Sequence, residues 1–203
     1  SLGGLSPSKN ELKTVVSISS KPIFPIVRPR GGDFFYSNQE FENMLSYISY
    51  CKEIGCSGIV VGMLTSDDKV DKERMKEIIA LAKPLEITFH KAFDFVTNSF
   101  LAVETLIEIG CDRILSGGKE MNAILGLKHL VQLQKKFDGQ IKILPGGGIR
   151  STNLQYFLDE NIFQEIHTAA ITENQNEFVD VVEIKRMKQQ ILLHPFTRKN
   201  IIY

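Results

Sequence analysis

Two histidines stand beside carboxylates at the ends of short apolar segments. In a strand that runs through Thr88, period-two alternation places Thr88 and His90 on one face, with Asp94 four residues further on. Glu165 and His167 repeat the alternation near the end of the chain. An imidazole near a carboxylate can act as a general base, a proton donor or a metal ligand. His90, Asp94, Glu165 and His167 are therefore the candidate catalytic residues, and the alternative is a hydrogen-bonded core histidine.

Two arginines follow another apolar segment and could bind an anion. Arg28 and Arg30 lie two residues apart, so that their guanidinium groups can share one face. The paired glycines Gly31 and Gly32 allow a tight turn near a ligand. We interpret Arg28 and Arg30 as candidate anion-binding residues. The alternative is an ion pair between Arg30 and Asp33 that stiffens the loop.

Glycine-rich segments follow two further predicted strands, at Ser116-Gly117-Gly118 and at Pro145 to Gly148. The second precedes a helix that we expect to begin at Ser151 or Thr152. Glycine-rich turns expose backbone N–H groups, which bind anions well near the start of a helix. Gly146, Gly147 and Gly148 are therefore candidate anion-binding residues, and the alternative is that the glycines permit tight packing.

Short apolar segments alternate with amphipathic segments along the whole chain. The predicted strands are Ile23 to Val27, Gly58 to Gly62, Glu86 to His90, Arg113 to Ser116, Ile141 to Leu144 and Glu165 to Thr168. The predicted helices are Ser8 to Ile18, Asn38 to Ile54, Asp71 to Leu81, Ser99 to Ile109, Asn122 to Phe137, Thr152 to Leu158 and a last helix capped by Asp180 and Glu183.

This alternation predicts an α/β fold, a TIM (β/α)8 barrel in a single domain over residues 1–203, with 194–203 as a C-terminal tail. Eight strand–helix units need roughly 250 residues, whereas this chain has 203 residues. The first predicted helix has no strand before it. We therefore expect the chain to lack the first two β-strands of the barrel. In such barrels the C-terminal ends of the strands carry function, and the candidate residues lie there.

Composition narrows the classes of partner and compartment. The chain has 24 Lys and Arg against 24 Asp and Glu, so no net field favours nucleic acid or an anionic membrane. No apolar segment approaches the roughly 20 residues that a membrane-spanning helix needs. Cys51, Cys56 and Cys111 are an odd and sparse set, which indicates reduced thiols and a cytoplasmic location. We expect no nucleic acid and no membrane among the partners.

Several sequence strings together resemble the CutC copper homeostasis protein family. They are V-R-P-R-G-G-D-F-F-Y-S at Val27 to Ser37, V-G-M-L-T at Val61 to Thr65, T-F-H-K-A-F-D at Thr88 to Asp94, P-G-G-G at Pro145 to Gly148 and E-I-H at Glu165 to His167. The similarity runs from the first residues to about Ala170. Lys91 stands where the family usually has Arg.

The resemblance implies a (β/α)8 barrel, often oligomeric, that takes part in cytoplasmic copper handling. In some members it implies Cu(I) binding through cysteines near the first two strands. None of the three cysteines of this chain matches those positions, so we assign no metal ligand here. The expected ligand is a small anion or a metal ion. We also expect the chain to associate with further copies of itself.

Two functions are consistent with these residues. The first is a CutC-like copper homeostasis protein that binds copper(I) in its full-length form. The alternative is a barrel enzyme that acts on a small anionic or phosphorylated substrate, held by Arg28, Arg30 and the Gly146 to Gly148 amides. The fold alone does not decide whether the chain is an enzyme.

Overall fold

The computed structural model describes residues 4–172 and 178–195. The chain divides into two compact units, of which the first ends at Ile114 and the second begins at Leu115. The single-domain organisation stays a prediction, and residues 196–203 of the predicted tail lie outside the described part. Within that part, no helix has the length and hydropathy that a membrane crossing needs.

The first unit contains a parallel sheet. Its strands are β1 (Gly58–Val61), β2 (Glu86–Phe89) and the first residues of β3 (Arg113–Ser116). β1 pairs with β2 from Gly58↔Glu86 to Val61↔Phe89, and β2 pairs with β3 at Thr88↔Arg113 and Phe89↔Ile114. The parallel α/β prediction is therefore confirmed for this unit.

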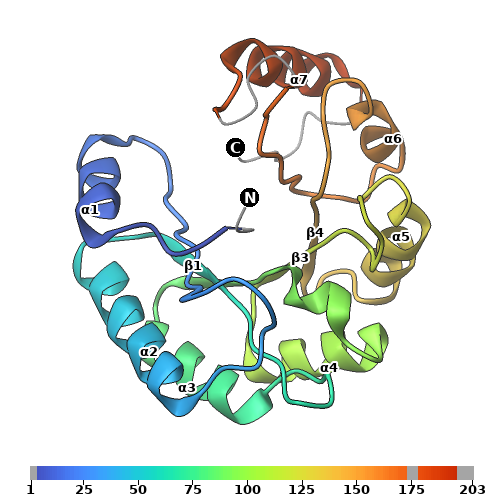
Figure 1. Cartoon of the computed structure of the whole chain (residues 1–203). Helices are drawn as coiled ribbons and strands as arrows, with labels where there is room; N and C mark the ends of the chain where they lie inside the picture. The colour runs from blue at the N-terminus through green and yellow to red at the C-terminus, as the bar shows by residue number, and fades with distance from the viewer. Residues whose placement is uncertain (1–3, 173–177, 196–203) are drawn as a thin grey trace. The chain divides into compact units, whose positions relative to one another are not determined.

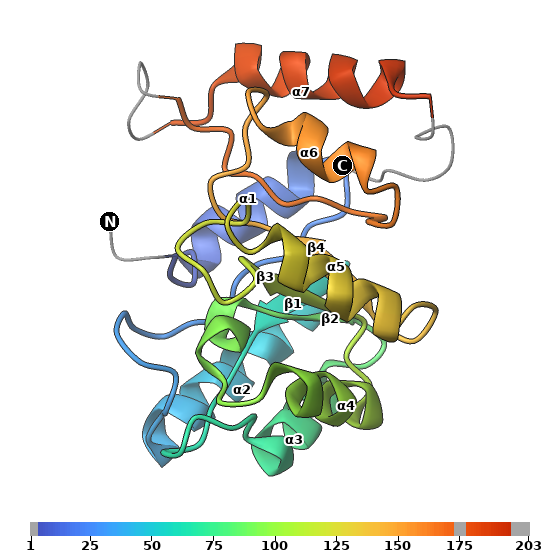
Figure 2. The same ribbon diagram turned by 90° about the vertical axis from the view of Figure 1, so that its right-hand side faces the viewer.

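Helices cover this sheet as the apolar spacing predicts. Figures 1 and 2 show α2 (Asn38–Glu53), α3 (Lys72–Ala82) and α4 (Ser99–Ile109) side by side next to the strands. Their buried positions recur every three or four residues, as in Phe41, Met44, Ile48 and Cys51 of α2. The unit also contains α1 (Lys9–Ile18) and the short 3₁₀ helix η1 (Lys91–Phe95).

The predicted strand Ile23 to Val27 is wrong as a regular strand. The segment forms one isolated parallel bridge to β1, Ile26↔Val60. Two hydrogen bonds make this bridge: Val27 N donates to Val60 O at 2.7 Å, and Val60 N donates to Pro25 O at 2.9 Å. Pro22 and Pro25 have no backbone N–H, so a continuous ladder cannot form through this segment.

The second unit holds the end of β3 with α5 (Leu127–Lys136), β4 (Lys142–Pro145), α6 (Leu154–Asp159) and α7 (Val181–Leu193). The predicted strand Glu165 to Thr168 is wrong as a strand, because it provides only the isolated bridge Gly146↔His167. α5 begins five residues later than predicted. A Cβ on Gly126 would lie 2.0 Å from Gly117 O, so this stretch packs as a turn against the β3 exit.

Glu183 does not complete the capping box that the sequence predicts for α7. Asp180 caps the helix by accepting from Val182 N and Glu183 N. The Glu183 carboxylate instead accepts from the backbone N and the hydroxyl of Ser151, and it is buried. This carboxylate therefore ties α7 to the loop before α6.

Candidate functional site

The first unit brings Arg28 and His90 together as buried polar side chains. Arg28 follows the segment bridged to β1, and His90 directly follows β2, where its backbone N donates to Val61 O at 3.0 Å. Arg28 is 7% exposed and His90 is 3% exposed. Both residues thus lie at the carboxyl ends of two extended segments that flank β1, as the barrel prediction expects.

The His90 ring is held in one orientation by its surroundings. Its Nδ1 accepts a hydrogen bond from Ala92 N at 3.2 Å, and a Cβ on Gly62 would lie 2.5 Å from Nδ1. The Phe34 ring packs 5.0 Å away, centroid to centroid. Because Nδ1 is an acceptor, the neutral imidazole carries its proton on Nε2.

The Nε2 atom of His90 is buried and has no hydrogen-bond partner among the described residues. Burial, followed by the positive charge of Arg28, lowers the pKa of His90 to about 3. His90 is therefore neutral near pH 7 and presents an N–H donor. A buried donor without a partner costs about 1–3 kcal/mol, which a ligand oxygen would recover.

Arg28 adds a permanent positive charge that acts on His90. Its Nη2 donates to Gly32 O at 2.8 Å, and its guanidinium lies 4.8 Å from the centre of the Phe34 ring. The guanidinium thus stacks on the Phe34 ring, which also packs against His90. A cation and a neutral N–H donor together favour a carboxylate or phosphate oxygen.

A pocket of about 430 Å³ lies on the same side of the first unit. Its lining combines aromatic, hydroxyl and acidic side chains: Gly32, Asp33, Phe34, Phe35, Leu64, Thr65, Ser66, Asp68 and Phe95. Phe34 belongs both to this lining and to the Arg28–His90 cluster, and its ring lies 5.5 Å from that of Phe95. Sequence reasoning missed Phe34 and Phe95, although the aromatic residues of F-F-Y and F-D-F were a usable signal.

Arg30 does not share this environment. It donates through Nε to Glu40 at 2.6 Å and through Nη2 to Asp33 at 2.9 Å, and it also binds the carbonyl of Phe35. These partners match the loop-stiffening alternative. An anion-binding role for Arg30 stays a prediction, and the contacts of its guanidinium with the protein do not support it.

Asp94 contacts Lys91 at 3.5 Å rather than the His90 ring. It lies in η1, and its side chain is 8% exposed. Neither ring nitrogen of His90 is hydrogen-bonded to Asp94, because Nδ1 accepts from Ala92 N and Nε2 has no partner among the described residues. A catalytic role for Asp94 itself stays untested.

The candidate residues of the second unit, Glu165, His167 and Gly146, do not form a buried polar cluster like that of Arg28 and His90. Glu165 accepts from Lys142 Nζ at 2.8 Å, whereas the His167 side chain is exposed. A Cβ on Gly146 would lie 2.4 Å from Leu115 Cδ1 and 3.1 Å from His167 Cβ, so packing accounts for this glycine. Their catalytic and binding roles stay predictions.

The two other glycines of this loop have positive φ angles, 125° for Gly147 and 73° for Gly148. The carbonyl of Gly147 accepts from Ala123 N, and that of Gly148 accepts from Asn153 Nδ2. The following helix begins at Leu154 and has six residues, later and shorter than predicted. The helix-dipole part of the anion prediction thus has little support.

The profile of the CutC family matches residues 1–172. A CutC family protein of Parabacteroides distasonis is 44% identical over 169 residues, which cover 83% of this chain and 70% of the relative. One from Proteus mirabilis is 45% identical over 168 residues, which cover 83% and 66%. The chain thus spans about two thirds of the length of these relatives.

Two solved structures have the same fold class. A CutC protein from Streptococcus agalactiae, whose name assigns it to copper homeostasis, has a TM-score of 0.77 and 28% identity and covers 82% of each chain. An aldolase, QR15, has a TM-score of 0.65 and 17% identity and covers 91% of this chain and 81% of its own. The second likeness concerns the fold alone. Together they confirm the TIM-barrel type of parallel α/β fold.

Proposed function

Because the chain belongs to the CutC family, and because its best-formed polar cluster consists of hydrogen-bond donors, we propose that it binds a small molecule carrying a carboxylate or phosphate group. Arg28 and His90 form the site. The observation that carries this proposal is the buried Nε2 of His90, which has no hydrogen-bond partner in the described part of the chain.

The protonation state of His90 defines its role at this site. A pKa of about 3 leaves the ring uncharged near neutral pH and makes it a poor base. We therefore propose that His90 donates a hydrogen bond to a ligand oxygen instead of moving a proton. With Arg28, it would stabilise negative charge that develops on that oxygen, which is how such donors contribute to enzyme catalysis.

Calorimetric titration with inorganic phosphate and with malonate tests this proposal. Parent binding and at least a 10-fold loss of affinity in Arg28→Met are expected, because one charge-assisted contact contributes about 1.5–3 kcal/mol. Lys91→Met is the matched control, since Lys91 is a nearby cation that pairs with Asp94. Arg28→Lys should keep part of the affinity. Absence of binding by the folded parent, or equal affinities in parent and Arg28→Met, would reject the site.

A role in copper homeostasis is the second candidate function. The name of the Streptococcus agalactiae neighbour motivates it. Across residues 4–172 and 178–195, no group of three or more His, Cys, Asp or Glu side chains could hold a metal ion. A site with three or four ligands therefore does not fit this part of the chain. The specific observation in favour of copper is a pair of adjacent thiols, Cys51 and Cys56.

The copper proposal has its own measurement. We expect the whole chain, titrated without oxygen against a chromophoric Cu(I) chelator, to withdraw one equivalent of Cu(I). Failure to compete for any Cu(I) would remove this candidate and would leave the anion site unaffected.

Cytoplasmic location and self-association are further proposals. The three cysteines are free thiols, which supports a reducing compartment. Large apolar side chains are exposed on α7, among them Val181, Val182, Leu192 and Leu193, which supports contact with a second copy. Sedimentation of the whole chain as a monomer at micromolar concentration would contradict self-association.

A further inference from the structure

The end of helix α2 brings two cysteines together through its backbone. Cys56 N donates to Cys51 O at 3.0 Å, and Gly55 N donates to Lys52 O at 3.2 Å. Gly55 adopts a left-handed conformation with φ of 85°. These bonds define a Schellman motif, in which the side chains at the first and last positions contact each other. Here those side chains belong to Cys51 and Cys56.

The two cysteines are neighbours in this motif and are screened from water. Cys51 and Cys56 are 0% and 4% exposed. Burial, followed by the neighbouring Cys56, raises the pKa of Cys51 to about 12, and burial also raises the pKa of Cys56.

We propose that Cys51 and Cys56 form a two-coordinate site for Cu(I). Paired sulfur donors without oxygen or nitrogen ligands select soft monovalent copper over harder ions. Binding converts two thiols and one Cu(I) into a bis-thiolate complex with a net charge of −1, and it releases two protons to solvent. This inference rests on the second candidate function for the choice of ion, and it is independent of Arg28 and His90.

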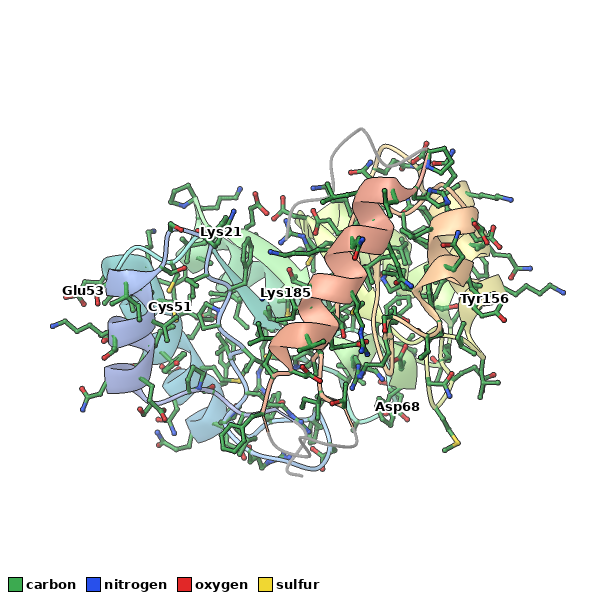
Figure 3. The ribbon with its side chains drawn as sticks, turned by 90° about the horizontal axis from the view of Figure 1, so that it is seen from above. Lys21, Cys51, Glu53, Asp68, Tyr156 and Lys185 are labelled. Carbon is green, nitrogen blue, oxygen red and sulfur yellow. The ribbon has the colours of Figure 1, made fainter. Side chains whose placement is uncertain are left out.

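Helix α1 provides both a counter-charge and a route of access. The positive charge of Lys9, at the start of α1, acts on Cys51 and would offset the negative complex. Two tyrosines of α2 hold the start of α1: Tyr47 Oη donates to Pro7 O, just before the helix, at 2.7 Å, and Tyr50 Oη donates to Lys9 O at 2.9 Å. Leu12 is the one buried residue of this helix, so little apolar contact opposes its displacement. Figure 3, which labels Cys51, shows that side chain near α1.

Helix α4 supplies an internal control, because it ends with the same motif. Cys111 N donates to Leu106 O at 3.0 Å, and Gly110 N donates to Ile107 O at 3.0 Å. Leu106 takes the position that Cys51 takes in α2, so Cys111 faces an aliphatic side chain. The two helix ends thus have the same backbone but different donor sets, and only the α2 end offers two sulfur atoms.

Anaerobic Cu(I) competition with bicinchoninate tests the site on the whole chain. We expect one Cu(I) per parent chain, at least a 100-fold loss of affinity in both Cys51→Ala and Cys56→Ala, and no change in Cys111→Ala. Leu106→Cys should add a second equivalent by giving α4 its own thiol pair. X-ray absorption of the parent complex should show two sulfur neighbours around copper.

The outcomes separate this inference from the function on which it rests. Parent-like binding in Cys51→Ala, or a copper environment of three or more ligands, would overturn the thiol-pair site while leaving the copper function in place. A parent chain that takes up no Cu(I) would overturn both. The phosphate and malonate titrations are unaffected by either result.

Discussion

His90 and His167 have similar backbone settings and opposite side-chain environments. Each backbone N–H donates to a carbonyl of the preceding extended segment, His90 to Val61 O at 3.0 Å and His167 to Pro145 O at 2.9 Å. Each ring lies near a glycine, Gly62 or Gly146. Yet His90 is buried and His167 is exposed. The strand-end position therefore does not by itself define a functional histidine.

The difference arises from what packs on each ring. His90 precedes η1, whose Ala92 N binds its Nδ1, and the Phe34 ring lies against it. These contacts fix the tautomer and keep water away from Nε2. A histidine at a strand end therefore becomes a buried donor only where other groups, here η1 and the Phe34 ring, also pack on its ring. Three measurements test this difference between His90 and His167.

The largest effect is expected from replacing the glycines beside the two rings. Gly62→Ala would place a Cβ 2.5 Å from His90 Nδ1, and the packed ring cannot move away, so a loss of about 1–3 kcal/mol in the free energy of unfolding is expected. Gly146→Ala mainly meets the flexible end of Leu115, and its cost should stay below about 1 kcal/mol. Urea unfolding of both variants measures the difference. Equal losses would show that the two rings are equally constrained.

A smaller effect is expected on the pH dependence of stability. The folded-state pKa of His90, about 3, lies below the ordinary value of 6.5. Between these values the unfolded chain binds a proton that the folded chain does not. Stability contributed by neutral His90 is therefore complete above pH 6.5 and declines as the pH falls towards 3, by up to about 1.4 kcal/mol per pH unit.

His90→Gln should flatten this part of the profile, measured by urea unfolding at a series of pH values. His167→Gln, measured in parallel, is the matched substitution in the second unit. If the slope disappeared in His167→Gln and persisted in His90→Gln, the assignment of this pH dependence to His90 would be wrong.

The smallest effects concern the lysines that pair with the carboxylate near each histidine. Lys91 and Lys142 are 40% and 39% exposed, and they lie 3.5 Å from Asp94 and 2.8 Å from Glu165. Both carboxylates also have other interactions. Lys91→Met and Lys142→Met should each cost less than about 1 kcal/mol, with the larger loss for Lys142. Calorimetric melting checks this, and a loss of several kcal/mol in either variant would contradict it.

The sequence predicted most helix boundaries because capping is local. Ser8, Asp71 and Asn98 cap helices that begin at the next residue, and Gly55 and Gly110 stand where α2 and α4 end. The first and last predicted strands were wrong as regular strands because ladder formation depends on partners far along the chain and on prolines within the segment.

The candidate site was predicted only in part. The sequence identified Arg28 and His90, because both residues close apolar segments. It could not show that Arg30 is bound by Asp33 and Glu40 or that His90 is neutral, since these properties depend on contacts between distant segments. The contact of Phe34 with His90 joins residues 56 positions apart.

At the proposed anion site, Phe34 would also affect how quickly a ligand arrives. Its ring borders the pocket of about 430 Å³ on one side and contacts Arg28 and His90 on the other. Because His90 Nε2 is buried, a molecule that bound it from this pocket would have to displace the Phe34 ring, which would slow both its entry and its escape. Association would accordingly be slower than diffusion, and residence longer than the number of polar contacts suggests. Selection between ligands at this site would then depend on time as well as on affinity.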